Sequence, residues 1–321
     1  MSSVVAMRRT LPVIIAAIVL LAACGSDSTG AGTSDVTDSS EITDSNEPAT
    51  SDDTVGSDPV GTDPAVTTNP NKPTVETPEE IPTELVVTVI EPGSGPESQA
   101  GDTVVVDYVG VRSSDGVEFD NSYDRGQPLD VVVGTKSVIQ GWDDGLIGVQ
   151  AGSRIRLDIP SDLAYGEKSN GELIGENEAL TFVIDVRAVS PPLEEPTETG
   201  VDPSEGATEI TTVDLREGEG AELQLGQTAI MRYVLFRGDN GVLLDSSWER
   251  NTVPFPLQEG SFPVLTEGLE GMKVGGRRAI SFPPAYPDFG FGPEGNPTSG
   301  LPAATDVVIV VDLLGAYDTP A

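Results

Sequence analysis

The feature that most constrains this chain is a long internal repeat. The tyrosine, aspartate and arginine of one pattern recur in the same order, each pair separated by 125 positions. The first copy carries Val106-Asp107-Tyr108, Phe119-Asp120-Asn121-Ser122 and Arg125, and the second carries Met231-Arg232-Tyr233, Leu244-Asp245-Ser246-Ser247 and Arg250. A chain with this pattern must fold as two copies of one domain.

Each copy has the pattern of a β-rich domain. Residues 104–112 of the first copy form a valine-loaded run, and alternating apolar residues in 155–159 predict a strand with one wet face. Residues 182–186 predict a last strand, and only 138–147 suits a helix. We therefore expect the α+β class: a twisted antiparallel sheet on one short helix in each copy.

The ends of the chain differ from the repeats in composition. Residues 1–24 have the pattern of an export signal, with Arg8-Arg9 before an apolar core. Residues 25–83 are rich in Ser, Thr, Pro and acids, with Lys72 as the only basic residue, which predicts a disordered tether. We expect domains at 84–190 and 207–318, joined by a linker at 191–206.

The run Leu21-Ala22-Ala23-Cys24 resembles the lipobox of bacterial lipoproteins. That resemblance implies cleavage before Cys24 and a diacylglycerol on its thiol. The alternative is a plain secretory signal with an incidental cysteine. We expect a protein held at the extracytoplasmic face of the cell membrane through the lipid alone.

Composition excludes several kinds of chemistry. The chain has no histidine and one cysteine, which rules out Ser-His-Asp and Cys-His catalysis, His-ligated metals and intrachain disulfides. A formal charge of −36 disfavours nucleic acid as a partner. We expect no metal and no cofactor, so any activity must come from carboxylates, hydroxyls, aromatic rings and the backbone.

Residues 84–189 resemble the FKBP family of macrolide-binding peptidyl-prolyl cis-trans isomerases over their whole length. The motifs that carry the resemblance are Gly101-Asp102-Thr103-Val104, Asp107-Tyr108-Val109-Gly110, Phe119-Asp120-Asn121-Ser122, Val138-Ile139-Gln140-Gly141-Trp142, Ile159-Pro160, Ala164-Tyr165-Gly166 and Ala179-Leu180-Thr181-Phe182. The resemblance implies proline-containing polypeptides as substrates and macrolide-type inhibitors as possible ligands of the first domain.

The resemblance also implies a proline pocket with Trp142 as its floor. Its walls would be Tyr108, Phe119, Val138, Ile139 and Phe182, with Ile174 and Tyr165 at the rim. Asp120 would lie beside Arg125 and Tyr108 at one edge, while the Ile139 N–H and the Tyr165 hydroxyl would bind substrate carbonyls. Leu129 stands where the family often has an aromatic ring, and the rim loop 166–171 lacks the usual Gly/Pro-rich stretch, which affects substrate preference.

The physical chemistry of the reaction suits such a pocket. Rotation about an X–Pro bond passes through a twisted amide, against a barrier of about 18–20 kcal/mol. The planar amide is the more polar form, so a dry aromatic pocket favours the twisted transition state without a covalent step.

Simpler interpretations exist for the main residues. Trp142 could be an ordinary core residue, although Asp143 and Asp144 follow it directly. Asp120 and Arg125 could be a solvated surface pair, although their recurrence in the repeat favours a partly buried pair oriented by Tyr108. Tyr165 could cap a strand instead of forming a rim.

The second copy, residues 209–317, resembles the family less closely. Tyr233, Asp245, Arg250 and Phe255 are expected at pocket positions. Leu265 replaces the tryptophan, Leu244 and Ile309 replace wall phenylalanines, Phe262 replaces the isoleucine and Phe289 replaces the rim tyrosine. We expect a fold that survives and a site that is weak or inactive.

These observations predict a membrane-anchored isomerase with one competent domain, which assists the folding of secreted proteins. One alternative is a non-catalytic module that grips proline-containing segments of an envelope partner. Another is a structural or adhesive surface protein that reuses the fold.

Overall fold

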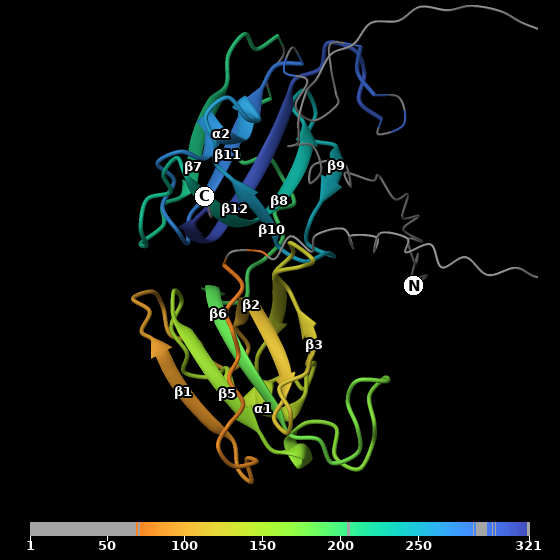
Figure 1. The fold of residues 1–321 in the computed structure, drawn as a ribbon. Coiled ribbons are helices and arrows are strands. Elements are labelled where there is room, and N and C mark those ends of the chain that lie inside the picture. The colour runs from red at the N-terminus through yellow and green to blue at the C-terminus, as the bar shows by residue number, and fades with distance from the viewer. Residues whose placement is uncertain are drawn as a thin grey trace, which may run out of the picture. The chain divides into compact units, whose positions relative to one another are not determined.

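The computed structural model describes residues 69, 71–203, 206–284, 286, 294–296, 298 and 300–319 (Figure 1). The predicted signal segment, Cys24 and most of the predicted tether lie outside the described residues, as does Phe289. Within the described part, no helix combines the length and apolar character needed to cross a bilayer.

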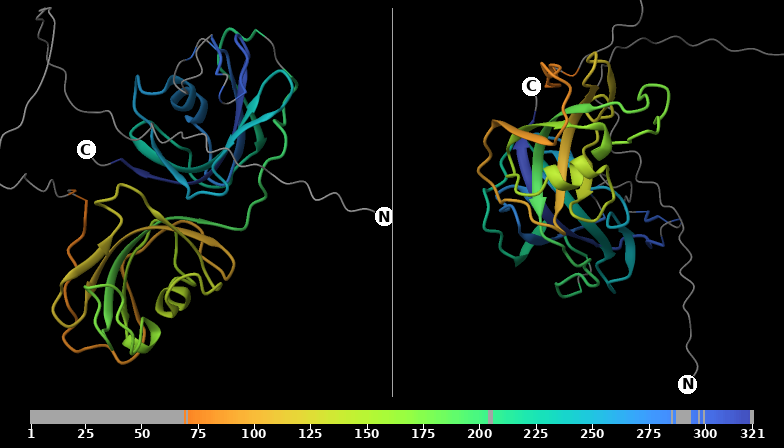
Figure 2. Two further views of the ribbon diagram at one scale, coloured as in Figure 1. Left: turned by 90° about the vertical axis from the view of Figure 1, so that its right-hand side faces the viewer. Right: turned by 90° about the horizontal axis from the view of Figure 1, so that it is seen from below.

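The first repeat is one antiparallel sheet that curves around a short helix (Figures 1 and 2). The strand order is β1-β5-β6-β2-β3, and β4 also pairs with β2. The elements are β1 (Val86–Glu91), β2 (Thr103–Arg112), β3 (Glu118–Asn121), β4 (Leu129–Val132), α1 (Gln140–Gly145), β5 (Arg154–Ile159), the 3-10 turn η1 (Ser161–Leu163) and β6 (Leu180–Ser190). The expected α+β fold is confirmed.

Alternation along the strands places the core between the sheet and α1. Ile155, Leu157 and Ile159 are buried on the inner face of β5, as their spacing predicts. The helix packs closely against this strand because Gly141 has no side chain: a Cβ there would lie 2.4 Å from Cγ2 of Ile159. The close approach brings the following Trp142 into the core.

The outer face of the sheet differs from expectation at its centre. Residues that point outward from β2, such as Val109 and Val111, are also buried. Val75, from the end of the predicted tether, packs against them and against Tyr123. The prediction of disorder through residue 83 is therefore wrong for residues 71–83, because this segment has an apolar side chain to bury.

The second repeat has the same topology. Its strand order is β10-β8-β12-β11-β7, and β9 also pairs with β8. The elements are β7 (Thr211–Arg216), β8 (Gln227–Arg237), β9 (Leu243–Ser246), β10 (Val253–Pro256), α2 (Pro263–Leu269), β11 (Arg277–Phe282) and β12 (Val307–Asp318). The internal repeat in the sequence is thus a structural repeat.

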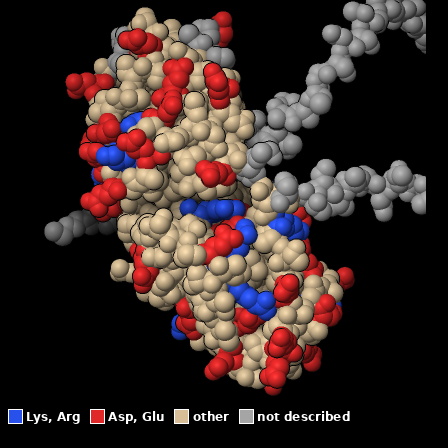
Figure 3. All heavy atoms as spheres, turned by 60° about the vertical axis from the view of Figure 1, so that its left-hand side comes forward, with Lys and Arg blue, Asp and Glu red and all other residues tan. Residues whose placement is uncertain are grey.

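Residues between and beyond the strands also make specific contacts. In the predicted linker, the Glu194 carbonyl accepts a hydrogen bond from Nη2 of Arg277 at 2.7 Å. In β4, Asp130 accepts hydrogen bonds from the Thr252 N–H at 2.9 Å and the Thr252 hydroxyl at 2.7 Å. Acidic side chains are spread over the face of the molecule seen in Figure 3, in line with the acidic composition.

Candidate active site

Three aromatic rings form a cluster with the indole of Trp142 in the first repeat. The Tyr108 ring lies 5.1 Å from Trp142 and the Phe182 ring 5.2 Å from it, both edge to face. Phe119 in turn lies 5.6 Å from Phe182. Trp142 is only 3% exposed. The structure therefore brings the predicted floor and three of the predicted walls into one aromatic cluster.

The other predicted pocket residues belong to the same cluster or its border. Leu129, Val138 and Ile139 are half-buried and pack against it. Ile174, predicted at the rim, is buried in the cluster itself. Tyr165, also predicted at the rim, is 37% exposed. The exposure of the side chains therefore increases from the buried Trp142 to Tyr165 at the surface.

Gly110, which the sequence analysis did not single out, is what lets the two phenylalanines meet. A Cβ at Gly110 would lie 2.6 Å from Cε1 of Phe182 and 2.8 Å from Cζ of Phe119. Both distances are shorter than packed carbon atoms allow. The absence of a side chain in the middle of β2 is therefore a requirement of the pocket wall. Alignment of the two repeats could have drawn attention to Gly110, because the second repeat has Leu235 at this position and the glycine is therefore specific to the first.

A polar triad forms one edge of the site. The Tyr108 hydroxyl donates to Asp120 and accepts a hydrogen bond of 2.8 Å from Nη2 of Arg125, which also pairs with Asp120. The Ser122 hydroxyl accepts the Tyr108 N–H at 3.0 Å and so fixes the loop to β2. The expected orientation of the pair by Tyr108 is present, but the side chains of Asp120 and Arg125 are 43% and 47% exposed, so the pair is less buried than expected.

The triad changes the acidity of the phenol. Burial of the ring and the hydrogen bond to Asp120 raise the pKa of Tyr108 to about 12. The neutral hydroxyl therefore persists at any physiological pH and continues to donate to the carboxylate. The edge supplies a fixed polar boundary to an otherwise apolar cluster.

Two N–H groups at the site have no partner within the described residues. The backbone N–H of Ile139, at the start of α1, makes no hydrogen bond to another described residue. Likewise, Nε1 of Trp142 is buried without a described partner. An amide donor beside an aromatic floor can hold a carbonyl oxygen while the adjoining ring rests on the indole.

The corresponding cluster of the second repeat has different side chains. Leu265 occupies the place of Trp142: each donates its N–H to the residue three positions earlier, both at 3.0 Å. Ile309 stands opposite Ile280 as Phe182 stands opposite Leu157. Leu235, fully buried, takes the place of the first repeat's glycine. The aromatic cup is replaced by packed aliphatic side chains.

The edge and the backbone of the second site are only partly retained. Tyr233 donates to Asp245 at 2.7 Å, and Arg250 bonds to both residues. Phe262, at the position of Ile139, has φ +41° and lies in the left-handed region, whereas Ile139 has φ −59°. Its N–H therefore has a different direction relative to the helix that follows.

One assignment in the second repeat is wrong. Val253 pairs with Met231, as Leu129 pairs with Val106, so Val253 stands at the Leu129 position. Phe255, which the sequence placed at a pocket position, corresponds to the buried Val131 because the preceding loop is one residue shorter. It packs against Phe262 at 5.9 Å. Phe289 lies outside the described residues.

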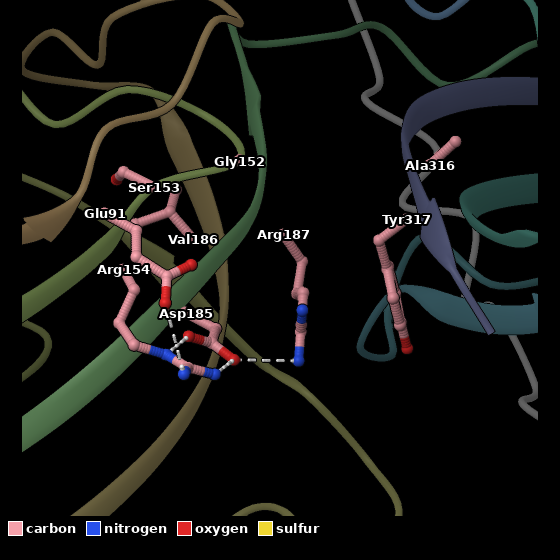
Figure 4. Close-up of a pocket in the computed structure, with 9 residues that line it drawn as sticks. All are labelled: Glu91, Gly152, Ser153, Arg154, Asp185, Val186, Arg187, Ala316 and Tyr317. Atoms are coloured by element: carbon pink, nitrogen blue, oxygen red, sulfur yellow. Dashed lines mark hydrogen bonds and ion pairs between the residues drawn. The ribbon is translucent and has the colours of Figure 1, made fainter. Parts of the chain in front are cut away.

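A polar hollow shown in Figure 4 is a different feature. Asp185 accepts two hydrogen bonds from Arg154, at 2.5 and 2.9 Å, and lies 3.1 Å from Nη2 of Arg187. The guanidinium of Arg187 stacks on the Tyr317 ring at 4.4 Å. Glu91 also pairs with Arg154 at 3.7 Å, so both guanidinium groups have carboxylate partners, and the lining offers no apolar floor for a proline ring. Within the described part of the chain, no group of acidic side chains is arranged to hold a metal ion.

Comparison with known proteins agrees with this geometry. The family described as FKBP-type peptidyl-prolyl cis-trans isomerase matches residues 95–187 and 220–314. The FK506-binding protein of Streptomyces anulatus is 48% identical over 120 residues, which are 37% of this chain and 97% of that protein. Human peptidyl-prolyl cis-trans isomerase FKBP10 is 35% identical over 214 residues, 64% of this chain and 34% of that protein. The chain thus matches about a third of the human relative's length.

A bacterial relative of known structure is also similar. The FKBP-type peptidyl-prolyl cis-trans isomerase FkpA of Escherichia coli is 44% identical over 109 residues, 34% of this chain and 39% of that protein. Its crystal structure aligns at 40% identity over 38% of this chain and 54% of that chain, with a TM-score of 0.31. Because the two family matches cover more than half of the sequence, this chain belongs to the FKBP-type peptidyl-prolyl cis-trans isomerases, a family of isomerase enzymes.

Proposed function

We propose that the first repeat catalyses cis-trans isomerisation of X–Pro bonds and that the second contributes little to the rate. The observation that carries this proposal is the buried indole of Trp142 with the Tyr108 and Phe182 rings edge-on to it. A proline ring placed on that floor would bring its amide into an apolar setting. This setting stabilises the less polar, twisted amide relative to the planar one.

The named residues then have separate roles. The aromatic rings exclude water, and the N–H of Ile139 holds a substrate carbonyl so that one side of the bond stays fixed while the other rotates. The triad of Tyr108, Asp120 and Arg125 keeps its polar groups paired with one another, so they do not bring water to the amide. No proton is transferred and no covalent intermediate forms.

The second repeat lacks two of these elements. Leu265 and Ile309 offer no aromatic floor or wall, and the backbone of Phe262 directs its N–H differently. The polar edge that the second repeat retains supports the fold but provides no aromatic floor. We assign it a role in holding polypeptide clients or in spacing.

The proposal places the enzyme outside the cytoplasm. The run Leu21-Ala22-Ala23-Cys24 supports lipid attachment at Cys24, and the acidic segment that follows supports a flexible tether. There the isomerase would accelerate proline-limited folding of exported proteins, a step that otherwise takes tens of seconds. A Cys24→Ser variant should leave the membrane fraction; if it remains there, the lipid anchor is wrong.

The test of activity is a proline-peptide isomerisation assay on the full-length protein. Trp142→Leu should lower kcat/KM by about tenfold or more, because the floor of the pocket is lost. Trp248→Leu is the matched control, since it removes the other indole of the chain and should leave the rate unchanged. Far-ultraviolet circular dichroism establishes that both variants fold.

Two outcomes would contradict the proposal. A folded Trp142→Leu variant as fast as the wild type would remove the pocket assignment. A wild-type rate equal to that of buffer would remove the isomerase function and favour the alternative, a module that binds proline-containing segments. In the Trp248→Phe protein Trp142 is the only indole, so its fluorescence reports such binding directly.

A further inference from the structure

A short segment before the first strand lies against the first repeat, and we name residues 71–77 the strap. Lys72 Nζ is 2.8 Å from Oε1 of Glu118 and 2.8 Å from Oδ2 of Asp124. Its side chain is 18% exposed, and its ammonium reaches both carboxylates. Lys72 is the only basic residue between positions 25 and 83. The otherwise acidic segment therefore has a single cation, and it is used here.

Two further contacts show that the strap is more than one ion pair. Val75 packs against Val109, Val111 and Tyr123 on the outer face of the sheet. The carbonyl of Glu76 accepts a hydrogen bond of 2.9 Å from Nη1 of Arg156. An apolar contact, a backbone contact and a double ion pair together fix the segment.

The ion pair closes the loop that carries the edge of the active site. Nδ2 of Asn121 bonds to the same two carboxylates, at 2.6 Å to Glu118 and 2.8 Å to Asp124. The Asp124 N–H returns a 2.7 Å bond to Oδ1 of Asn121. Two carboxylates that share one amide would repel each other without a cation between them, so Lys72 neutralises the arrangement.

This loop carries three of the pocket's groups. Phe119, Asp120 and Arg125 all lie between or beside the two acids that Lys72 bridges. The family match begins at residue 95, so the strap precedes the part of the chain that the family model matches. Burial opposes the charge on Lys72, but hydrogen bonds to Asp124 and Glu118 outweigh it and raise the pKa of the ammonium. The cation is thus permanent at neutral pH.

We propose that Lys72 is a positioning residue for the isomerase site: through Glu118 and Asp124 it fixes the loop that aligns Asp120 and Arg125 with Tyr108. This inference rests on the proposed function. The activity of the first domain would then depend on a segment that precedes its first strand.

The test compares Lys72→Met, Lys72→Arg and Lys273→Met in the full-length protein. Lys273 forms a similar surface pair with Glu217 at 2.7 Å in the second repeat, so its variant controls for the loss of one charge. Lys72→Met should lower kcat/KM by about three- to tenfold, because small misplacements of aligned groups are costly. Lys72→Arg should restore most of the rate, and Lys273→Met should leave it unchanged.

A double-mutant cycle separates positioning from general destabilisation. If Lys72 acts through the loop, Lys72→Met should have no further effect on kcat/KM in an Asp120→Ala background. Hydrogen exchange should speed up at residues 121–125 and remain slow in β6. An equal loss of rate in both backgrounds, or a Lys72→Met rate and exchange pattern like those of Lys273→Met, would overturn the inference. Failure of the proposed isomerase function would be seen in a different measurement: the wild-type protein would isomerise the peptide no faster than buffer alone.

Discussion

Tyr108 donates a hydrogen bond from its hydroxyl to Asp120, and the same pair recurs as Tyr233 and Asp245 in the second repeat at 2.7 Å. In both repeats the backbone N–H of the tyrosine also bonds to a serine hydroxyl, at 3.0 and 2.8 Å. The edge is therefore common to a site with an aromatic floor and a site without one. Its presence in both repeats indicates a structural role, and only the first repeat places an aromatic floor beside it.

Removal of the Asp120 carboxylate should show whether this edge contributes to catalysis as well as to the fold. Asp120→Ala leaves the Tyr108 hydroxyl and the Arg125 guanidinium without their acceptor, and we expect kcat/KM to fall by about tenfold. Asp239→Ala is the control, because Asp239 also accepts hydrogen bonds from an arginine, at 3.0 and 2.6 Å, but lies in a turn of the second repeat. Equal rates for the two variants would show that the edge does not contribute to catalysis.

The glycine beneath the pocket wall gives a second prediction. In Gly110→Ala, the new methyl group would displace Phe182 and Phe119, which lie within 3 Å of its position. We expect a loss of kcat/KM of about tenfold and a loss of stability of about 1–3 kcal/mol from overpacking. Gly175→Ala should change neither, since a Cβ there meets nothing within 4 Å. The peptide assay gives kcat/KM and a urea titration gives the stability of each variant. An unchanged kcat/KM for Gly110→Ala would mean that the Phe119 and Phe182 rings can rearrange without loss of activity.

Much of the fold could be predicted because each strand alternates and the whole pattern occurs twice. The indole, its aromatic neighbours and the Tyr108–Asp120–Arg125 edge all lie where the motifs placed them. The assignment of Phe255 failed because the loop before β10 is one residue shorter than its counterpart. A deletion in a loop shifts every later residue in register, and side-chain type alone does not reveal it.

The strap could not be predicted for a different reason. The composition of residues 25–83 predicts that they cannot form a core of their own. The contacts of Lys72 and Val75 are made with another part of the chain, so they depend on which acids and valines the folded domain presents. Gly110 was missed in a similar way, since its importance comes from two rings brought together by other strands.

The pKa of Tyr108 gives a prediction for stability against pH. Burial and the bond to Asp120 raise this pKa to about 12, above the value near 10 expected for the unfolded chain. The folded state thus holds the proton more tightly, so the contribution is complete below about pH 10 and is lost as the pH rises toward 12. The difference in unfolding free energy between wild type and Tyr108→Phe should shrink by about 2 kcal/mol over this range, as urea titrations at several pH values can measure. A constant difference would show that the phenol is not perturbed.

The second site should resist repair by a single substitution. Leu265→Trp supplies the missing indole, but the buried Leu235 and Phe282 stand where the first repeat has the smaller Gly110 and Ile159. Phe262 also keeps its left-handed backbone, so the amide donor stays misdirected. In a Trp142→Leu background, where the first site is weakened, we expect no recovery of the isomerisation rate and a loss of about 1–3 kcal/mol of stability. Leu225→Trp, at an exposed position, controls for an added indole. Recovery of the rate by Leu265→Trp alone would show that the floor, and not the filled wall or the turned backbone, is what the second repeat lacks.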